Sequence, residues 1–200
     1  MSFSITVKQK LFDLSTPRVM GILNATPDSF YTGSRARTEK EIARRANQII
    51  EEGATVIDVG AFSTRPGAEQ VSQSEEMKRL RKALTVVRKE LPDVVISVDT
   101  FRPEVAQMCV EEYGADIIND VSEGGLTGVA NVPLEPETGE LPQIFHTVAR
   151  LGVPYILMSV QPTLREVLLG FARKVSQLRT LGVKDIILDP GYGFGKTVEQ

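Results

Sequence analysis

The sequence predicts an α/β fold built on a parallel sheet, and three features of the chain lead to this prediction. Short apolar runs rich in Val and Ile alternate along the chain with longer segments of helical periodicity. Most of these runs lack an alternation of apolar and polar residues, which is typical of strands buried on both faces. Each run leads through a polar loop into a helix, and repeated βα units favour a parallel sheet, either a barrel or a doubly wound one.

Six apolar runs are expected to form strands, with five complete helices following the first five of them. The expected strands are residues 19–23, 55–59, 94–98, 116–118, 154–158 and 185–188. The common closed α/β barrel, the TIM or (β/α)8 barrel, has eight strands and eight helices. Because the chain ends at Gln200, where a sixth helix is expected to begin, about six of the eight βα units are expected in it.

Helix faces and helix ends can be predicted from the spacing of particular residues. Apolar stripes with helical spacing comprise Ile42, Ala46, Ile49 and Ile50, then Met77, Leu80, Leu84 and Val87, then Leu164, Val167, Leu168, Phe171, Val175 and Leu178. Capping boxes are expected at Thr38 with Glu41, Ser72 with Glu75 and Thr163 with Glu166. Gly53, Gly114, Gly152 and Gly182 follow helical stretches, where left-handed C-caps are expected.

The chain is expected to be a single domain over residues 1–200, incomplete at its C-terminus. Residues 1–17 precede the first βα unit and are expected to form an N-terminal extension or hairpin. Residues 124–140 are rich in Gly and Pro and fit the repeat badly, so we expect a long excursion after the fourth strand.

Composition excludes several classes of protein. The net charge of −3 and the sequence pI near 5.4 leave no basic face for nucleic acid. No apolar run approaches the length of a membrane span, and the N-terminus lacks the apolar core of a signal peptide, so a soluble cytoplasmic protein is expected. Cys109 is the single cysteine and is expected to be a small buried hydrophobe. His146 is the single histidine and is expected to have a surface or core role.

Polar side chains stand at or near the ends of five of the six expected strands. They are Asn24, Asp58, Asp99, Asn119 with Asp120, and Asp189. Asp and Asn are also common turn and cap residues, so one such residue alone would indicate little. In parallel α/β folds the carboxyl ends of the strands gather around one crevice, and carboxylates and amides there can grip a ring that carries both donors and acceptors.

The loops after the first two strands are long and polar, with Gly and Pro at intervals, as active-site loops on rigid scaffolds tend to be. In the second loop Arg65 offers a planar pair of donors for phosphate or carboxylate, and the Ser63 and Thr64 hydroxyls lie next to it in the sequence.

Six motifs in order along the chain carry a resemblance to a known family. Residues 20–30 read Met-Gly-Ile-Leu-Asn-Ala-Thr-Pro-Asp-Ser-Phe, and residues 58–67 read Asp-Val-Gly-Ala-Phe-Ser-Thr-Arg-Pro-Gly. The others are Ser97–Thr100, Ile117–Asp120, Ile156–Met158 and Leu188–Lys196. From about Arg18 to Lys196 the chain closely resembles the dihydropteroate synthases.

That resemblance implies a (β/α)8 barrel and a reaction. The family joins 6-hydroxymethyl-7,8-dihydropterin diphosphate to 4-aminobenzoate, giving 7,8-dihydropteroate and diphosphate in folate biosynthesis, with Mg²⁺ as cofactor. A cationic pterin intermediate forms in the family as diphosphate departs. These two small molecules are therefore the expected substrates, and a homodimer is expected for a full-length chain.

The resemblance also assigns roles to residues by position. Asp99, Asn119 and Asp189 are expected to hydrogen-bond the pterin, with Met158 and Phe194 as apolar lining. Asn24 is expected to help bind Mg²⁺. Thr64 and Arg65 belong to the loop implied to help bind diphosphate, and Phe30 and Pro66 are implied to form the aminobenzoate pocket. Asp58 is implied to steady the metal loop or to have a structural role.

Two of the chain's departures from the family pattern bear on its expected activity. Ser159 stands where the family commonly has a histidine, and Ser159 cannot carry a charge near the diphosphate. A lysine from the strand 7 region and an arginine and histidine after strand 8 have no counterpart in this sequence. Two alternatives therefore stay open: a non-catalytic pterin-binding protein or fragment, and another pterin-binding barrel such as a methyltetrahydrofolate methyltransferase.

Overall fold

The computed structural model of the chain describes residues 3–25, 39–61, 71–125, 141–194 and 196. Two short strands come first, β1 (Ser4–Val7) and β2 (Lys10–Asp13), which pair in an antiparallel hairpin. The hairpin turn is made by Lys8 and Gln9, both with positive φ, at 50° and 61°. Two successive left-handed residues are typical of a type I′ turn, whose twist matches that of the strands it joins.

Six parallel strands follow, and each pairs with the next one along the chain. They are β3 (Met20–Asn24), β4 (Val56–Gly60), β5 (Val95–Asp99), β6 (Ile117–Asp120), β7 (Tyr155–Met158) and β8 (Ile186–Asp189). Doubly wound sheets reverse their strand order at a switch point, whereas barrel strands run in sequence order. The β3-to-β8 order therefore confirms the barrel-type prediction, although each strand begins one residue later than predicted.

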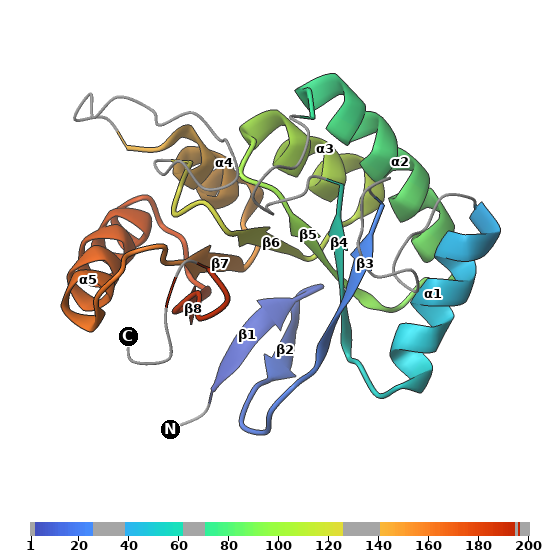
Figure 1. Cartoon of the computed structure of the whole chain (residues 1–200), viewed down its shortest axis with the longest axis horizontal. Coiled ribbons are helices and arrows are strands. Elements are labelled where there is room, and N and C mark those ends of the chain that lie inside the picture. The colour runs from blue at the N-terminus through green and yellow to red at the C-terminus, as the bar shows by residue number, and fades with distance from the viewer. Residues whose placement is uncertain (1–2, 26–38, 62–70, 126–140, 195, 197–200) are drawn as a thin grey trace.

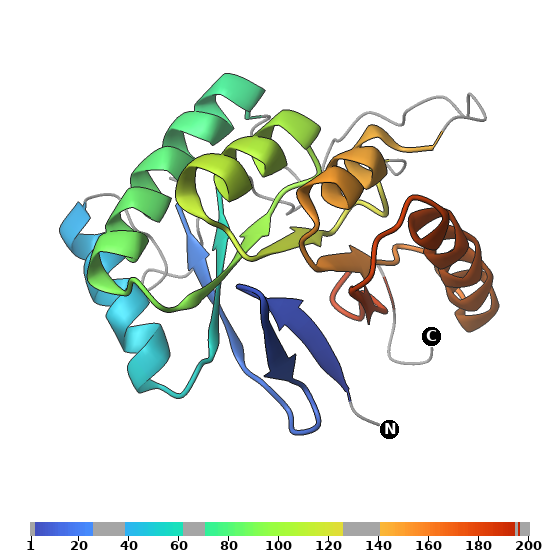
Figure 2. The same cartoon turned by 180° about the vertical axis from the view of Figure 1, so that it is seen from behind.

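Five helices cover the outer face of this sheet (Figures 1 and 2). They are α1 (Glu39–Glu51), α2 (Gln73–Glu90), α3 (Pro103–Tyr113), α4 (Gln143–Leu151) and α5 (Leu164–Thr180). Ser72 and Thr163 cap α2 and α5 as predicted, each accepting from the backbone N–H three residues later. Thr38 lies outside the described residues. None of the described helices has the length and apolar character needed to cross a membrane.

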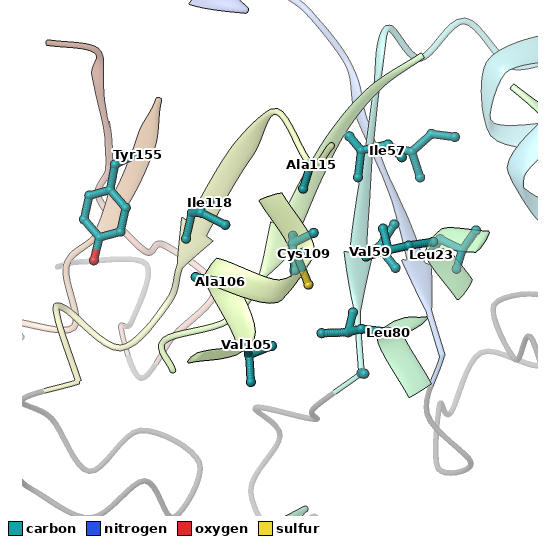
Figure 3. Packing of buried hydrophobic residues seen from close by; sticks show 14 of the residues in the cluster. Leu23, Ile57, Val59, Leu80, Val105, Ala106, Cys109, Ala115, Ile118 and Tyr155 are labelled. Carbon is teal, nitrogen blue, oxygen red and sulfur yellow. The ribbon is translucent and has the colours of Figure 1, made fainter. Parts of the chain in front are cut away.

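The main hydrophobic core lies between the helices and the outer face of the sheet. Figure 3 shows part of this cluster, in which side chains of α2 and α3 face those of β3, β4 and β6. Cys109 is fully buried there, as predicted, whereas His146 is exposed on α4. The predicted stripe on α5 is wrong in part, because Leu164 and Leu168 are exposed at 67% and 59% while Phe171 is buried.

A second, smaller core fills the inner face of the sheet at the amino ends of its strands. Ile5 and Val7 of the hairpin pack there against inward-facing side chains of the parallel strands. Those side chains are Val56, Val95, Ile117, Ile156 and Ile187. The hairpin therefore fills the amino end of the half-closed barrel. The inward-facing positions nearer the carboxyl end of each strand are not covered by it.

Polar contacts tie the hairpin to the starts of three strands. The Thr6 N–H donates to Asp185 Oδ2 at 3.0 Å, just before β8. Lys8 Nζ donates to the carbonyls of Asp93 and Val94 at 3.0 and 3.1 Å, just before β5, and lies 4.0 Å from Asp116, just before β6. Contacts with strands from both halves of the sheet fix the hairpin across the amino end.

Candidate active site

The strand register brings four residues from successive strands to one level. Asn24 on β3 is paired with Gly60 on β4, Gly60 with Asp99 on β5, and Asp99 with Asn119 on β6. Side chains at alternate positions of a strand share a face, so Asp99 lies on the same face as Val95 and Asn119 on the same face as Ile117. This row therefore faces the inside of the sheet, at the carboxyl ends of the strands.

Gly60 allows the side chains on either side of it to approach one another. A Cβ atom built on Gly60 would lie 3.2 Å from Asn24 Oδ1 and 3.5 Å from Asp99 Oδ2. Any larger residue there would push against one or both of these oxygens. The glycine thus leaves space in which an amide oxygen and a carboxylate oxygen face a common point above β4.

A second row of polar residues lies two positions deeper on the same face. Asp58 on β4 is paired with Ser97 on β5, and both are buried. Asn119 Nδ2 donates to Asp58 Oδ2 at 3.1 Å, which fixes the orientation of the Asn119 amide and directs its carbonyl oxygen elsewhere. In this structure Asp58 therefore orients the Asn119 amide.

Two buried polar atoms in the deeper row have no hydrogen-bond partner in the described part of the chain. They are Asp58 Oδ1 and Ser97 Oγ. Leaving a buried polar group unpaired costs about 1–3 kcal/mol, so such groups in a native protein call for an explanation. The explanation lies within the site, because the two side chains are neighbours on β4 and β5.

Several buried carboxyl groups lie close together in and around the site. Burial raises the pKa of Asp99 well above its ordinary value, and the negative charges of Asp58, Glu76 and Asp120 raise it further. Burial also raises the pKa of Asp58, against which the nearby Ser97 and Asn119 side chains act. Ser97 therefore lies close to Asp58, although the two orphaned atoms form no well-shaped hydrogen bond. A cationic or donor-rich ligand would relieve this crowding.

Asp120 ends β6, as expected, but its side chain does not join the inward-facing row. Asp120 is one position beyond Asn119, so it points to the helix side of the sheet. There its carboxylate accepts hydrogen bonds from the backbone and hydroxyl of Ser122, the backbone of Gly124 and the Tyr155 hydroxyl. Asp120 is thus a structural residue that shapes the turn after β6.

The other side of the site is formed by β7 and β8. Met158 is fully buried and is paired in register with Asp189. Asp189 Oδ1 accepts from the Gly191 N–H at 2.8 Å, which fixes the orientation of this carboxylate. Gly191 has φ of 66°, and a Cβ there would lie 2.3 Å from the Ser159 carbonyl oxygen, so no other residue fits this turn.

Lys196 and Phe194 lie on the loop that follows β8. Lys196 Nζ donates to the carbonyls of Ser159 and Gly191 at 3.0 and 3.2 Å, and so joins the ends of β7 and β8. The half-buried Phe194 is held in the same turn by a bond from its N–H to the Gly191 carbonyl at 3.0 Å. The structure thus brings Met158, Asp189 and Phe194 to one end of the sheet.

The remaining predicted site residues cannot be placed. Phe30, Thr64, Arg65 and Pro66 lie outside the described residues, so their roles stay predictions. Two site residues were not assigned a role from the sequence, namely Gly60 and Ser97. The two-residue period of a strand could have indicated them. Gly60 lies two residues from Asp58, and Ser97 two residues from Asp99, so each shares a face with a site aspartate.

Asn24 is compatible with the expected role in binding Mg²⁺. Its Oδ1 is one hard oxygen, directed toward the open space above Gly60. Among the described residues no group of three or more His, Cys, Asp or Glu side chains could hold a metal by itself. Mg²⁺ commonly takes one or two protein oxygens and completes its shell with water and substrate phosphates, so a single amide oxygen fits that mode.

A sequential parallel sheet with inward-facing carboxylates and amides at its carboxyl end is typical of α/β-barrel enzymes, whose active sites lie at that end. The model of the family described as "Pterin binding enzyme" matches residues 20–200. The chain is 40% identical to a dihydropteroate synthase of Synechocystis over 98% of its length, and 38% identical to the Escherichia coli enzyme over 94%. The chain belongs to this pterin-binding family, and within it to the dihydropteroate synthases.

Solved structures agree with this assignment. The structure is similar to a Yersinia pestis dihydropteroate synthase in complex with a sulfonamide drug, with a TM-score of 0.82 and 31% identity over 98% of the chain. It is also similar to a Xanthomonas albilineans dihydropteroate synthase with 4-aminobenzoic acid, with a TM-score of 0.75 and 32% identity. The chain spans 68% of the Synechocystis protein, 66% of the E. coli protein and 71% of the Y. pestis chain.

Proposed function

We propose that this chain supplies the pterin site of a dihydropteroate synthase. The reaction joins 6-hydroxymethyl-7,8-dihydropterin diphosphate to 4-aminobenzoate, with 7,8-dihydropteroate and diphosphate as products. The observation that carries the proposal is the row of Asn24, Gly60, Asp99 and Asn119 at one level of the sheet. The buried side chains of Asp58 and Ser97 lie on the same face beneath this row.

The donor and acceptor pattern of the row suits a pterin. The pterin ring has an exocyclic amino group and ring N–H groups that donate, and a carbonyl and ring nitrogens that accept. A carboxylate accepts two parallel N–H bonds, and such charge-assisted bonds are the strong ones. We assign this role to Asp99 and Asp189, while the Asn119 amide, oriented by Asp58, offers its carbonyl oxygen.

The same carboxylates can assist the chemical step. The C–O bond between the pterin methylene carbon and diphosphate breaks, and the amino nitrogen of 4-aminobenzoate forms a bond to that carbon and loses a proton. Positive charge develops on the ring as diphosphate departs. Fixed negative groups aimed at that charge, in a site shielded from water, stabilise the transition state more than the ground state. Asp99 and Asp189 would do this from the ring side.

Asn24 would hold Mg²⁺ at the other end of the substrate, where the cation would offset the negative charge of the departing diphosphate. Asn24 and Asp99 approach one another over Gly60, so the metal end and the ring end of the site are adjacent. Thr64 and Arg65 are assigned to the diphosphate on the basis of the family motif alone.

The competing proposal is a pterin-binding protein without chemistry, and Ser159 is the observation that favours it. Ser159 is fully buried, its hydroxyl accepts from the Gln161 N–H at 3.3 Å, and a serine hydroxyl carries no charge with which to replace a histidine imidazole. Binding and turnover therefore need separate measurements.

Calorimetric titration with 6-hydroxymethylpterin tests the binding part. Asn119→Ala should weaken binding by about tenfold or more, since it removes a hydrogen bond in a buried site. His146→Ala, which changes an exposed residue on α4, should leave the affinity unchanged. Absence of pterin binding to the unaltered chain would refute the proposal.

Formation of dihydropteroate from both substrates with Mg²⁺ tests the catalytic part. Turnover that depends on Mg²⁺ supports the synthase. Pterin binding without turnover under the same conditions supports the non-catalytic alternative.

A further inference from the structure

Glu76 on α2 is a fully buried carboxylate that no part of the proposed reaction uses. Both of its oxygens are engaged. Oε1 accepts from the Thr100 hydroxyl at 2.8 Å, and Oε2 pairs with the Arg102 guanidinium. Burial raises the pKa of Glu76, and the positive charge of Arg102 acts against that rise. Thr100 and Arg102, which follow Asp99 closely in the sequence, thus stabilise the buried Glu76 carboxylate.

The turn that follows β5 is held from two sides through Thr100. The Thr100 N–H donates to the Asn119 carbonyl on β6 at 3.0 Å. The Thr100 hydroxyl donates to Glu76 on α2 and also accepts from the Arg102 N–H at 3.3 Å. Since Thr100 is the residue that follows Asp99 in the chain, these contacts fix the backbone from which the Asp99 side chain projects.

Arg102 connects the same turn to the start of α2. Its second guanidinium nitrogen donates to the Val71 carbonyl at 2.8 Å, immediately before the Ser72 cap. The Arg102 guanidinium also lies over the Phe101 ring, 5.1 Å from its centroid. The buried carboxylate, the threonine and the arginine thus form one connected unit behind the inner face of the sheet.

We propose that Glu76 and Thr100 are positioning residues for Asp99: the Glu76 carboxylate, held by Arg102, fixes the turn after β5 and so directs Asp99 toward the pterin. Neither residue touches the ligand. The proposal rests on the proposed function for its ligand, but the rigidity of the turn can be measured without any ligand.

Three variants separate positioning from stability. Thr100→Val keeps the shape of the side chain and removes its donor, whereas Thr100→Ser keeps the hydroxyl. Val148→Ala creates a cavity in the buried face of α4, away from the site, and serves as a variant that is destabilised without disturbing Asp99. Glu76→Gln is a fourth variant, because it keeps an acceptor for Thr100 while weakening the pairing with Arg102 in case Thr100→Val does not fold.

The first measurement is the affinity for 6-hydroxymethylpterin, with melting temperatures recorded in parallel. Misplaced groups in a preorganised site cost large factors, so Thr100→Val and Glu76→Gln should each raise the dissociation constant about tenfold. Thr100→Ser and Val148→Ala should stay within about twofold of the unaltered chain, although Val148→Ala melts earlier. Equal affinity for the valine and serine variants, or an equal loss in Val148→Ala, overturns the proposal.

The second measurement is backbone hydrogen exchange at Asp99–Arg102 without ligand. Exchange of the Thr100 amide should be faster in Thr100→Val and unchanged in Thr100→Ser, since that amide is protected by its bond to Asn119. Unchanged exchange in Thr100→Val overturns the proposal whatever the pterin does. If the unaltered chain binds no pterin, the proposed function fails while hydrogen exchange still decides whether Thr100 fixes the turn.

Discussion

Asp99 carries a conflict between binding and stability. Its pKa is raised well above the ordinary value because burial disfavours its charge and Asp58, Glu76 and Asp120 repel it. A carboxyl group with a raised folded-state pKa favours folding below its unfolded-state pKa, and that contribution is lost as pH rises through the folded-state pKa. At neutral pH, above its ordinary pKa, Asp99 therefore disfavours folding of the ligand-free protein relative to acidic pH.

Replacement of Asp99 by Asn should separate these two effects. Asp99→Asn should melt at a higher temperature than the unaltered chain at pH 7, and the difference should shrink as pH falls toward 3.8, the ordinary pKa. The same variant should bind pterin more weakly by about 1.5–3 kcal/mol, since it loses a charge-assisted hydrogen bond. Thermal melts across pH and calorimetric titration check both parts.

The exposed Asp93, at the turn before β5, provides the control. Asp93→Asn should change neither the melting temperature nor the pterin affinity appreciably. If Asp99→Asn were less stable than the unaltered chain at pH 7, the conclusion that the buried Asp99 carboxyl disfavours folding at that pH would be wrong.

Cys109 should be chemically silent in the folded protein. It is fully buried on α3, and burial raises the pKa of its thiol, with the charges of Glu76 and Glu112 raising it further. The thiolate is the reactive form, so a raised pKa keeps the sulfur protonated at neutral pH. Ellman's reagent at pH 8 should label no thiol in the native chain and one thiol per chain in guanidinium. Rapid labelling of the native chain would contradict the packing of α3 on the sheet.

At the scale of elements, the β1–β2 hairpin should act as part of the core. Ile5 is 5% exposed and packs on the inner face of the sheet, whereas Leu11 on the same hairpin is 80% exposed. Ile5→Ala should therefore lower the free energy of unfolding by about 2–4 kcal/mol. Leu11→Ala is the matched control and should change it by less than about 0.5 kcal/mol. Urea titration of both variants checks this, and equal effects would mean that the hairpin does not fill the amino end of the sheet.

The element boundaries show where prediction from sequence works and where it stops. Ser72 and Thr163 were predicted as caps because a capping box is a contact within four residues. The exposure of Leu164 and Leu168 could not be foreseen, since helical spacing says which residues share a face but not which part of that face is covered. Asp120 was predicted to stand at a strand end and does so, but adjacent residues of a strand point to opposite faces, so it does not share a face with Asn119.

At the scale of the whole molecule, the sequential sheet could be predicted from the repeat, and the convergence of Asn24, Asp99 and Asn119 follows from it. The long-range hydrogen bonds behind the site could not be predicted from the sequence. Thr100 contacts Glu76 across 24 residues, and Asn119 contacts Asp58 across 61. Such pairs depend on how helix and strand are placed in space, and nothing in their local sequence marks them as partners.

Within the part of the chain that the structure describes, the sheet of six strands has two unpaired edges, at β3 and β8. Leu188 on β8 is 45% exposed, and unpaired edges with exposed apolar side chains are templates for pairing with another chain. The chain should therefore associate as its concentration rises. Leu188→Lys should reduce this association, because edge lysines oppose strand pairing. Light scattering over a range of concentrations, with the surface change Arg150→Ala as control, checks the prediction; identical behaviour of Leu188→Lys and the unaltered chain would contradict it.

The contact between the Thr6 N–H and Asp185 links residues 179 positions apart. On a ribosome the hairpin emerges before the parallel strands, and its partner before β8 emerges 179 residues after it. At about 5–20 residues per second, the hairpin waits roughly 10–35 s before that contact can form. Its apolar side, with Ile5 and Val7, is exposed throughout synthesis of the strands that will cover it. The hairpin is therefore made before the strands that it packs against and is among the last elements to complete its contacts, and the nascent chain should be most in need of chaperones during that interval.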